Sequence, residues 1–342
     1  MLTIDGASGE GGGQVLRTSL ALSAVTGKAF SIERLRGKRA KPGLMRQHLT
    51  AVKAIAEICG ARVSGAELGS QALVFEPGVV KHGDYHFAVG TAGSATLVFQ
   101  TVLPALLMAQ GKSSIVFEGG THNPMAPPFD FIGQTFLPLV QRMGATVSAE
   151  LVSSGFYPAG GGRFDVQIEG GAKLQPLELT TRGDLQSVRI KAVVSKLSEK
   201  IAMREAQVLA SALAEYPIEV ETARIESSGP GNVASVTICW ASLTETFTRF
   251  GEVGVRAEAV AHRLAGEVRG YLESDAPVGE HLADQLLIPL ALAGGGSFRT
   301  SEPSLHTRTN AEVIGMFLPI RIEFEQVEKQ WVLSVAPRAG VE

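Results

Sequence analysis

The chain has 342 residues, of which 45% are hydrophobic and 19% are charged, and its formal net charge is −3 at pH 7. This length and composition predict a globular protein with a sizeable core and with two or three domains. The slightly acidic balance excludes a protein that coats long stretches of nucleic acid, so any recognition of anions must be local.

The start of the chain, MLTIDGASGEGGG, has neither the basic segment nor the apolar segment of a signal peptide. The apolar run LPALLMA at 103–109 is too short to span a bilayer. Cys59 and Cys239 lie far apart and without a CxxC pattern, so we expect neither a disulfide framework nor a structural zinc site. We therefore predict a cytoplasmic protein with no membrane segment.

A first block of predicted elements begins with a Gly-rich turn. GGGQVLRTSLALSAVTGK at 11–28 predicts an apolar helix, AFSIERL a strand, and GLMRQHLTAVKAIAEICGA a second helix. Before the second helix, RLRGKRAKPGLMR at 34–46 contains six Lys or Arg and no acid among its thirteen residues. Such a run is usually a solvated face, but here glycine and proline interrupt it, and a phosphate-binding segment fits equally well.

The same layout of helix, strand and helix recurs twice. It is found as GSATLVFQTVLPALLMAQGK (93–112), SSIVFEGG and FDFIGQTFLPLVQRMGA, and again as GEHLADQLLIPLALAGGG (279–296), SFRTSEP and TNAEVIGMF. Self-similarity of this kind indicates a repeated supersecondary unit. We predict an α/β (α+β) fold in which three βαβαββ-like units pack around a pseudo-threefold axis.

Residues 182–275 interrupt the repeats. SVRIKAVVS predicts a strand and SEKIAMREAQVLASALA a helix; two strands, IEVETARIE and VASVTICWA, and the helix RAEAVAHRLAGEVRGYLES follow. We predict an inserted βαββα domain over 182–275, and a three-repeat catalytic domain over 1–181 and 276–342. The insert has no chemical motif, so we expect a packing or substrate-positioning role.

Polar residues interrupt the apolar first helices, or their entry turns, in all three repeats. Around a pseudo-threefold axis such positions converge. A structural role at a helix end explains any one of them, but their recurrence at matching positions favours one shared site, since an unpaired buried polar group costs about 1–3 kcal/mol. These residues are Glu10, Gln14, Arg17, Gln100, Asp284 and Gln285.

A single histidine lies in the stretch SEPSLHTRTNAEVI at 301–314. Thr309 and Glu312 fit a capping box, which predicts a helix start near residue 309 and places His306 in the preceding loop. The positive end of a helix is a ready site for a phosphate. There, a neutral imidazole could serve as ligand, base or nucleophile; the alternative is an ordinary solvated loop histidine.

Several motifs together resemble the RNA 3'-terminal phosphate cyclase family over essentially the whole chain, including the place and size of the insert. They are GASGEGGGQVLRTSLALS, RGKRAKPGLMRQHL, GFYPAGGG, HLADQLLIPLALA and HTRTN. GFYPAGGG at 155–162 is the most specific of them. One departure is Ser154, which stands where the family usually has a basic residue and so removes one further phosphate contact.

The resemblance implies a ligase-type enzyme of RNA processing that uses ATP to convert an RNA 3'-phosphate into a 2',3'-cyclic phosphate. His306 would attack the α-phosphorus of ATP and form a covalent histidinyl-AMP. The AMP would pass to the RNA 3'-phosphate, and the 2'-hydroxyl would then displace it. Imidazole suits this role because it is mostly neutral at cellular pH. The partners would be RNA ends that carry a 3'-phosphate.

The resemblance also implies roles for other residues. Asp284 is expected to orient His306 through a hydrogen bond, and Glu10 to bind Mg²⁺ or Mn²⁺ because hard cations prefer oxygen ligands. The nucleotide-binding positions would be Gln100, His281, Leu282, Ala283, Asp284 and Gln285. Arginines would neutralise pyrophosphate and the RNA phosphate; they are Arg17, Arg36, Arg39 and Arg46, with Lys38 and Lys41 as weaker candidates.

Two alternatives of other classes stay open: a non-catalytic cyclase-like RNA-binding scaffold, which would lack the histidine nucleophile, and a carboxyvinyl transferase built from the same repeated unit. A P-loop kinase is disfavoured because GASGEGGG lacks the GK[ST] ending. The sequence does not decide the physiological RNA, the metal or the oligomeric state, with a homodimer among the states considered.

Overall fold

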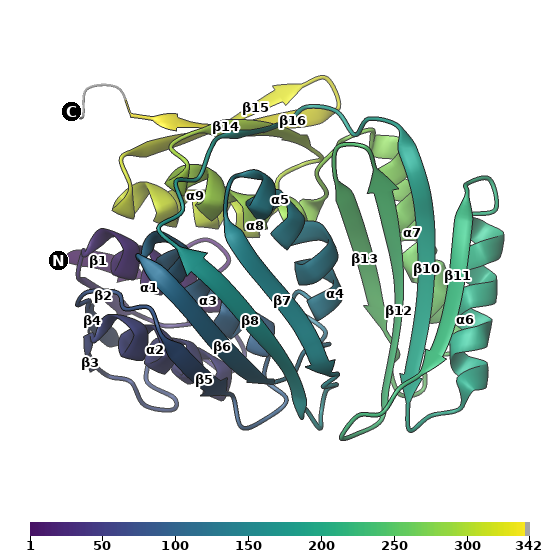
Figure 1. Ribbon diagram of the computed structural model, residues 1–342, viewed down its shortest axis with the longest axis horizontal. Helices are drawn as coiled ribbons and strands as arrows, with labels where there is room; N and C mark the ends of the chain where they lie inside the picture. The colour runs from purple at the N-terminus through teal and green to yellow at the C-terminus, as the bar shows by residue number, and fades with distance from the viewer. Residues whose placement is uncertain (339–342) are drawn as a thin grey trace.

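Three four-stranded sheets of identical topology form most of the computed structural model, which describes residues 1–338 (Figure 1). Their strand orders are β1-β2-β4-β3, β5-β6-β8-β7 and β9-β14-β16-β15. In each sheet the first two strands are parallel, and the fourth strand pairs antiparallel with both the second and the third. The predicted α/β class is confirmed, and the order βαβαββ occurs three times.

Each repeat places one helix between its first two strands and another before its final pair. The first repeat contains β1 (Leu2–Asp5), α1 (Gly13–Thr26), β2 (Phe30–Glu33), α2 (Arg46–Cys59), β3 (Arg62–Ser64) and β4 (Leu73–Glu76). The second contains β5 (Asp84–Ala88), α3 (Ala95–Met108), β6 (Gly111–Gly119), α4 (Phe129–Phe131), the π-helical turn η1 (Ile132–Phe136), α5 (Leu137–Arg142), β7 (Thr146–Ser153) and β8 (Gly162–Gly170). The third contains β9 (Leu177–Leu179), α8 (Glu280–Leu292), β14 (Gly296–Thr300), α9 (Leu305–Phe317), β15 (Ile320–Val327) and β16 (Gln330–Pro337).

Helices α3 and α8 share an internal proline at the same place. Pro104 and Pro289 each lie nine residues after the first residue of their helix, from 95 to 104 and from 280 to 289. A proline has no N–H to donate to the carbonyl four residues earlier. The main-chain carbonyls of Gln100 and Gln285 therefore lack their helical partners, and both residues belong to the set predicted to converge.

The insert forms a separate sheet between β9 and α8, with strand order β11-β10-β12-β13. Helices α6 and α7 cover one side of this sheet (Figure 1). The predicted βαββα order was wrong by one strand, because TETFTRF is rich in threonine and lacks the apolar alternation that we sought. The insert contains β10 (Leu185–Ser195), α6 (Glu199–Ala212), β11 (Ile218–Arg224), β12 (Gly231–Trp240), β13 (Thr244–Phe250) and α7 (Ala257–Ser274).

The repeats and the insert have separate hydrophobic cores. One large cluster joins the three repeats, and a second cluster lies between α6, α7 and the insert sheet. A small third cluster, in which Phe156 packs with Val193 and Val233, joins the second repeat to the insert. We therefore propose that residues 182–275 form a domain of their own, attached to the repeats by this contact, by the packing of β13 on α4 and η1, and by the two connecting segments.

Arg182 joins the chain segment that enters the insert to the segment that leaves it. Its Nε donates to the carbonyl of Ala276 at 2.8 Å and its Nη1 to that of Leu272 at 3.0 Å, while Nη2 donates to the carbonyl of Tyr271. The guanidinium also lies over the ring of Tyr271, 4.1 Å from its centroid. The entry to the insert is thus bonded to its exit just before α8.

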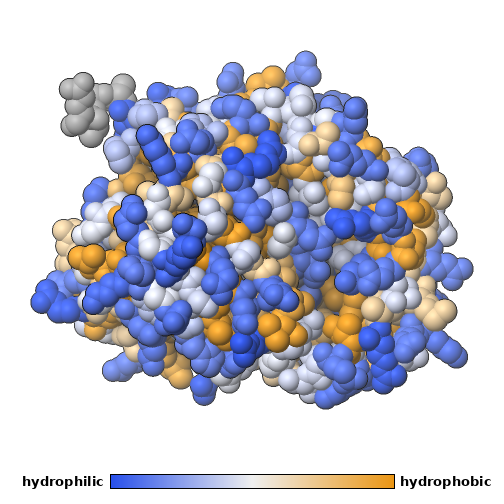
Figure 2. All heavy atoms as spheres, in the orientation of Figure 1, coloured by the Kyte–Doolittle hydropathy of each residue, from blue (hydrophilic) through white to orange (hydrophobic). Residues whose placement is uncertain are grey.

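The surface is mixed in character. Figure 2 shows hydrophilic residues over most of one face, with hydrophobic residues in small separate groups. Within residues 1–338, no helix is both long and apolar enough to cross a membrane. The cytoplasmic location stays a prediction.

We predict that Arg182→Met lowers the free energy of unfolding by about 3 kcal/mol or more, since it removes a charged donor from three carbonyls in a buried setting. Arg182→Lys, which keeps the charge with fewer donors, should lose less. Urea midpoints of the three proteins test this. A midpoint for Arg182→Met equal to that of the wild type would show that the connecting segments do not depend on this side chain.

Candidate active site

His306 lies in the first turn of α9. The helix begins at Leu305, and the Ser304 hydroxyl accepts the Thr307 N–H at 3.3 Å. The predicted start at 309 was therefore wrong, because Ser304 rather than Thr309 is the cap. Thr309 is buried: its hydroxyl donates to the Leu305 carbonyl at 2.7 Å and accepts the Glu10 N–H at 3.0 Å.

The imidazole of His306 is held by the side-chain amide of Gln14. His306 Nδ1 lies 2.7 Å from Gln14 Oε1. Since the amide nitrogen of Gln14 donates to Asp284, its oxygen faces the ring and can only accept. Nδ1 therefore carries the ring proton. The lone pair of the neutral ring is then on Nε2, on a side chain that is exposed to solvent.

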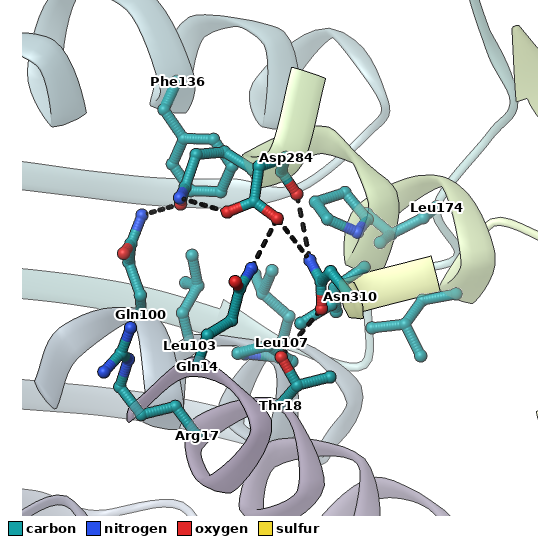
Figure 3. Close-up of a pocket in the computed structure, with 15 residues that line it drawn as sticks. Gln14, Arg17, Thr18, Gln100, Leu103, Leu107, Phe136, Leu174, Asp284 and Asn310 are labelled. Carbon is teal, nitrogen blue, oxygen red and sulfur yellow. Dashed lines mark hydrogen bonds between the residues drawn. The ribbon is translucent and has the colours of Figure 1, made fainter. Parts of the chain in front are cut away.

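Asp284 is the acceptor on which this arrangement converges. Oδ1 accepts from Gln14 and, at 3.0 Å, from Asn310, whose own oxygen accepts the Thr18 hydroxyl at 2.8 Å. Oδ2 accepts from Gln285 at 3.3 Å. Figure 3 shows Gln14 and Thr18 extending from α1 toward Asp284 and Asn310. Asp284 was predicted to bond His306 directly; instead, the connection runs through Gln14.

Burial raises the pKa of the Asp284 carboxyl, and the hydrogen bonds from Gln14 and Asn310 oppose this rise. The nearby His306 ring and the Arg17 guanidinium oppose it as well. The carboxyl thus depends on its donors to remain ionised, and Gln14 is the donor that also contacts the histidine.

A small cavity of about 70 Å³ adjoins this network. Its polar side includes Gln100, whose amide donates to Gln285. The rest of the lining is apolar and includes the two helix prolines. The apolar lining consists of Leu103, Pro104, Leu107, Phe136, Leu174, Ile288, Pro289 and Leu292. The cavity therefore combines polar side chains of the network with hydrocarbon.

The start of α1 is surrounded by charged side chains at very short range. A Cβ on Gly12 would lie 2.3 Å from Glu10 Oε2 and 2.5 Å from Arg39 Nη2, so a larger residue there would displace one of these two charged groups. Glu10 is buried; its Oε2 pairs with Arg39, and its Oε1 accepts the Gln14 N–H at 3.3 Å. Together the glycine amides and the arginines form a cradle suited to an anion.

Arg17 lies one turn further along α1 and lines the cavity. Burial lowers the pKa of its guanidinium to about 10, against the opposing effects of Glu10 and Asp284. It therefore remains a cation at neutral pH, in a place where little water screens its charge.

His48 completes the cradle and was missed in the sequence. Its Nδ1 accepts the Met45 N–H at 3.2 Å, which leaves the proton on Nε2. A Cβ on Gly13 would lie 2.4 Å from that Nε2 and 2.7 Å from Arg17 Nη1. Burial, reinforced by the neighbouring arginines, lowers the pKa of His48 to about 3. The available signal was a histidine in the first turn of a second helix, as at His306.

Other predicted residues lie less directly at the site. Arg36 Nη1 donates to the carbonyls of Lys41 at 2.7 Å and Gly43 at 2.8 Å, so this arginine also shapes its own loop. Arg46 is exposed at the start of α2. The side chains of Leu282 and Ala283 are buried in the core, and exposed His281 stands before them in the first turn of α8. Any contact of Leu282 and Ala283 with a nucleotide would involve their backbone.

Comparison of the sequence with known proteins identifies a family. The family model described as RNA 3'-terminal phosphate cyclase matches residues 8–324. The chain belongs to this family. Proteins named RNA 3'-terminal phosphate cyclase are 50% identical in Koribacter versatilis, over 100% of this chain and 97% of the relative, and 50% identical in Pseudomonas fluorescens, over 98% and 97%. The protein of that name in Salmonella typhimurium is 48% identical, over 98% of this chain and 99% of the relative.

The family resemblance implies a metal, and Glu10 is the residue predicted to bind it. Among residues 1–338 no group of three His, Cys, Asp or Glu side chains is placed to hold a metal ion. A single carboxylate fits a cation whose remaining ligands are phosphate oxygens and water, as Mg²⁺ often takes. Glu10 fits that limited role, because a carboxylate oxygen that accepts from Arg39 retains a further lone pair.

We predict that His48 makes this cyclase-family protein sensitive to mild acid. Its pKa is depressed in the folded state, so below the ordinary value of 6.5 the unfolded chain binds a proton that the folded chain does not. Stability is therefore lost as the pH falls from about 6.5 toward 3, at about 1 kcal/mol per pH unit.

His48→Asn removes the titrating ring, and its amide oxygen can replace Nδ1 as acceptor for Met45. Its unfolding free energy, from urea titrations at pH 6.5 and 4.5, should fall less than that of the wild type. Carboxylates that also protonate affect both proteins alike. Equal losses in the two proteins would contradict the assignment of a neutral, buried His48.

Proposed function

We propose that this protein uses ATP to convert the 3'-phosphate of an RNA end into a 2',3'-cyclic phosphate, through a covalent histidinyl-AMP on His306 and an RNA-adenylate. The observation that carries the proposal is the bond of His306 Nδ1 to Gln14, which leaves the Nε2 lone pair free on an exposed ring. A nucleophile with a fixed tautomer, next to a cationic cradle, is what phosphoryl transfer requires.

In the first step, Nε2 forms a bond to the α-phosphorus of ATP, and the bond from that phosphorus to the bridging oxygen breaks to release pyrophosphate. Nδ1 keeps its proton and its bond to Gln14. The ring thus carries a positive charge, which makes it a good leaving group in the next step. No proton has to move to or from the histidine during the attack.

The cradle at the start of α1 would bind the leaving pyrophosphate. Arg17 and Arg39 supply fixed positive charge, and neutral His48 adds an N–H donor at the same place. A cation on the triphosphate, bound in part by Glu10, would further neutralise the charge that develops on the leaving group. These groups are in position before ATP binds, which lowers the reorganisation that the reaction needs.

In the second step, an oxygen of the RNA 3'-phosphate attacks the α-phosphorus, and the bond to Nε2 breaks. The neighbouring 2'-hydroxyl then attacks the 3'-phosphorus, loses its proton, and displaces AMP. The sum converts ATP and an RNA 3'-phosphate into the cyclic phosphate, AMP and pyrophosphate. The small cavity beside Gln100 and Gln285, which polar and apolar side chains line, would receive part of the nucleotide.

The alternative of a non-catalytic RNA-binding scaffold has less support. Such a protein would not need His306, nor the chain of bonds from Asp284 through Gln14 that orients it. A carboxyvinyl transferase would not need a histidine in one tautomer beside a phosphate cradle. Covalent labelling by ATP separates both alternatives from the proposed enzyme.

We predict that Gln14→Leu slows adenylylation of His306 by about a hundredfold, because the ring loses both its tautomer control and its orientation. Asn310 and Gln285 still donate to Asp284 in this variant, so the fold should be kept. Single-turnover labelling with ATP at saturating concentration measures the rate. An unchanged rate would exclude Gln14 as the positioning residue.

We also predict that ATP labelled at the α-phosphate, with a divalent cation, gives a labelled protein whose bond survives base and is lost in acid. A phosphoramidate behaves in this way, whereas a serine phosphoester does not. His306→Ala should abolish the label, and His262→Ala, which removes an exposed histidine of α7, should not. Label retained in His306→Ala, or seen only with γ-labelled ATP, would contradict the proposed function.

A further inference from the structure

We propose that the turn at 155–161, with Tyr157 at its tip, binds single-stranded RNA upstream of the reacting 3' end by stacking on a base. The inference rests on the proposed function for the identity of the ligand. We use the name RNA-docking band for the exposed row formed by Lys41, Arg46, Met125, Tyr157 and Lys196. None of these residues has a part in the phosphoryl transfer derived above, although Arg46, and Lys41 as a weaker candidate, were predicted to bind phosphate.

Tyr157 lies on the exposed part of a turn whose other aromatic residue is buried. Phe156 is 2% exposed and packs with Val193 and Val233 of the insert, whereas the next residue, Tyr157, is 67% exposed. The reversal of direction is completed by Gly160 and Gly161, both at positive φ. An aromatic ring in water, next to a neighbour buried in the core, has an apolar face that a ligand can cover.

The turn is also firmly held. Gly155 donates its N–H to the Thr121 hydroxyl at 2.9 Å, and its carbonyl accepts the N–H groups of Thr121 and His122 at 3.0 Å each. His122 is itself buried, with Nε2 2.8 Å from Asp130 Oδ2. The exposed ring therefore projects from a fixed base, and binding would cost little ordering of the backbone.

A second apolar side chain projects from the adjoining loop. Met125 is 92% exposed and has φ +65°, and Asn123 anchors its loop by donating to the Ala92 carbonyl. An exposed aromatic ring and an exposed, polarisable thioether on adjoining loops suit bases of any identity, because stacking is tolerant of sequence. This matches an enzyme that would act on the end of an RNA rather than on a particular sequence.

The band is continuous with the catalytic site through α2 and the start of α3. His48 belongs to the phosphate cradle, and the preceding residue, Gln47, accepts the Ser94 N–H at 3.0 Å through its side chain. The same turn contacts the tyrosine turn, since a Cβ on Gly160 would lie 2.9 Å from Thr91 O and from Ala92 Cα. A strand whose 3'-phosphate enters the cradle when pyrophosphate is absent from it would therefore meet this turn next.

The three cations of the band lie on both sides of the tyrosine turn. Lys41 and Arg46 are exposed at the cradle end, and Lys196 is exposed on the insert, where its Nζ donates to the Ser228 carbonyl at 2.8 Å. Such spacing suits a phosphate backbone. Ser154, which replaces the usual basic residue, is buried, and its carbonyl accepts the Ser227 hydroxyl at 2.7 Å. No charge is offered there, so the tyrosine is the main contact at the turn.

Binding without turnover tests the proposal. Fluorescence anisotropy with a labelled single-stranded RNA of about ten nucleotides and a 3'-phosphate, in the absence of ATP, gives the Kd. Tyr157→Ala should raise the Kd about tenfold, which is the loss of one base stacked on an aromatic ring. Tyr157→Phe should restore binding to within about twofold. A dinucleotide that ends in a 3'-phosphate should bind both variants as it binds the wild type.

Met203→Ala is a matched control for Met125→Ala, since Met203 is exposed on α6 of the insert. Lys173→Gln, which changes an exposed lysine between β8 and β9, is a control for Arg46→Gln and Lys196→Gln. Arg46→Gln and Lys196→Gln should each reduce the slope of log Kd against log salt by about one, and Lys173→Gln should leave this slope unchanged.

Equal Kd values for wild type and Tyr157→Ala with the longer RNA would overturn the proposal. So would an equal loss for the dinucleotide, since that would place Tyr157 at the reacting end. Because these measurements need no ATP, they are independent of the labelling of His306. Tyr157-dependent binding by a protein that never becomes labelled would reject the proposed reaction and keep the docking surface.

Discussion

The site depends on one buried carboxylate, because Asp284 is where side chains from α1, α8 and α9 meet. Its donors Gln14, Asn310 and Gln285 come from those three helices, and Gln285 extends the connection to Gln100 on α3. A buried carboxylate without donors would take up a proton, so the packing of four helices and the ionisation of one group constrain each other. The exposed histidine takes its orientation from this interior arrangement.

An amide between an acid and an imidazole has a particular chemical effect. A carboxylate bonded directly to His306 would favour the imidazolium, which has no lone pair for attack. Gln14 transmits the position of Asp284 without placing a negative charge against the ring. The imidazole that we propose as the nucleophile is therefore oriented without a carboxylate in contact with it.

Much of the architecture was predictable because the chain repeats. Three apolar helices with the same flanking turns indicated three equivalent units, and their polar interruptions indicated which residues meet.

The register of α9 was not predictable from local signals, since Ser304 and Thr309 are both good caps. The strand β13 was missed because threonines replaced the apolar residues that mark a buried strand. His48 was missed because nothing local reveals that a histidine will be buried among arginines, and the place of Gln14 between Asp284 and His306 required three helices to be packed together.

The three second helices begin at structurally equivalent places, yet the residues before or within their first turns make different contacts. In the first repeat this position carries the arginines and His48, in the second the anchored loop around His122, and in the third His306. If one ancestral unit was copied twice, the copies have since acquired different residues, and each contributes a different part of the site. The internal pseudo-symmetry of the fold is thus absent from the candidate site, which agrees with the proposed reaction, since that reaction has one nucleophile, one leaving group and one incoming strand. A substitution that makes the first turn of one second helix resemble the other two would therefore remove the contacts that only this repeat supplies.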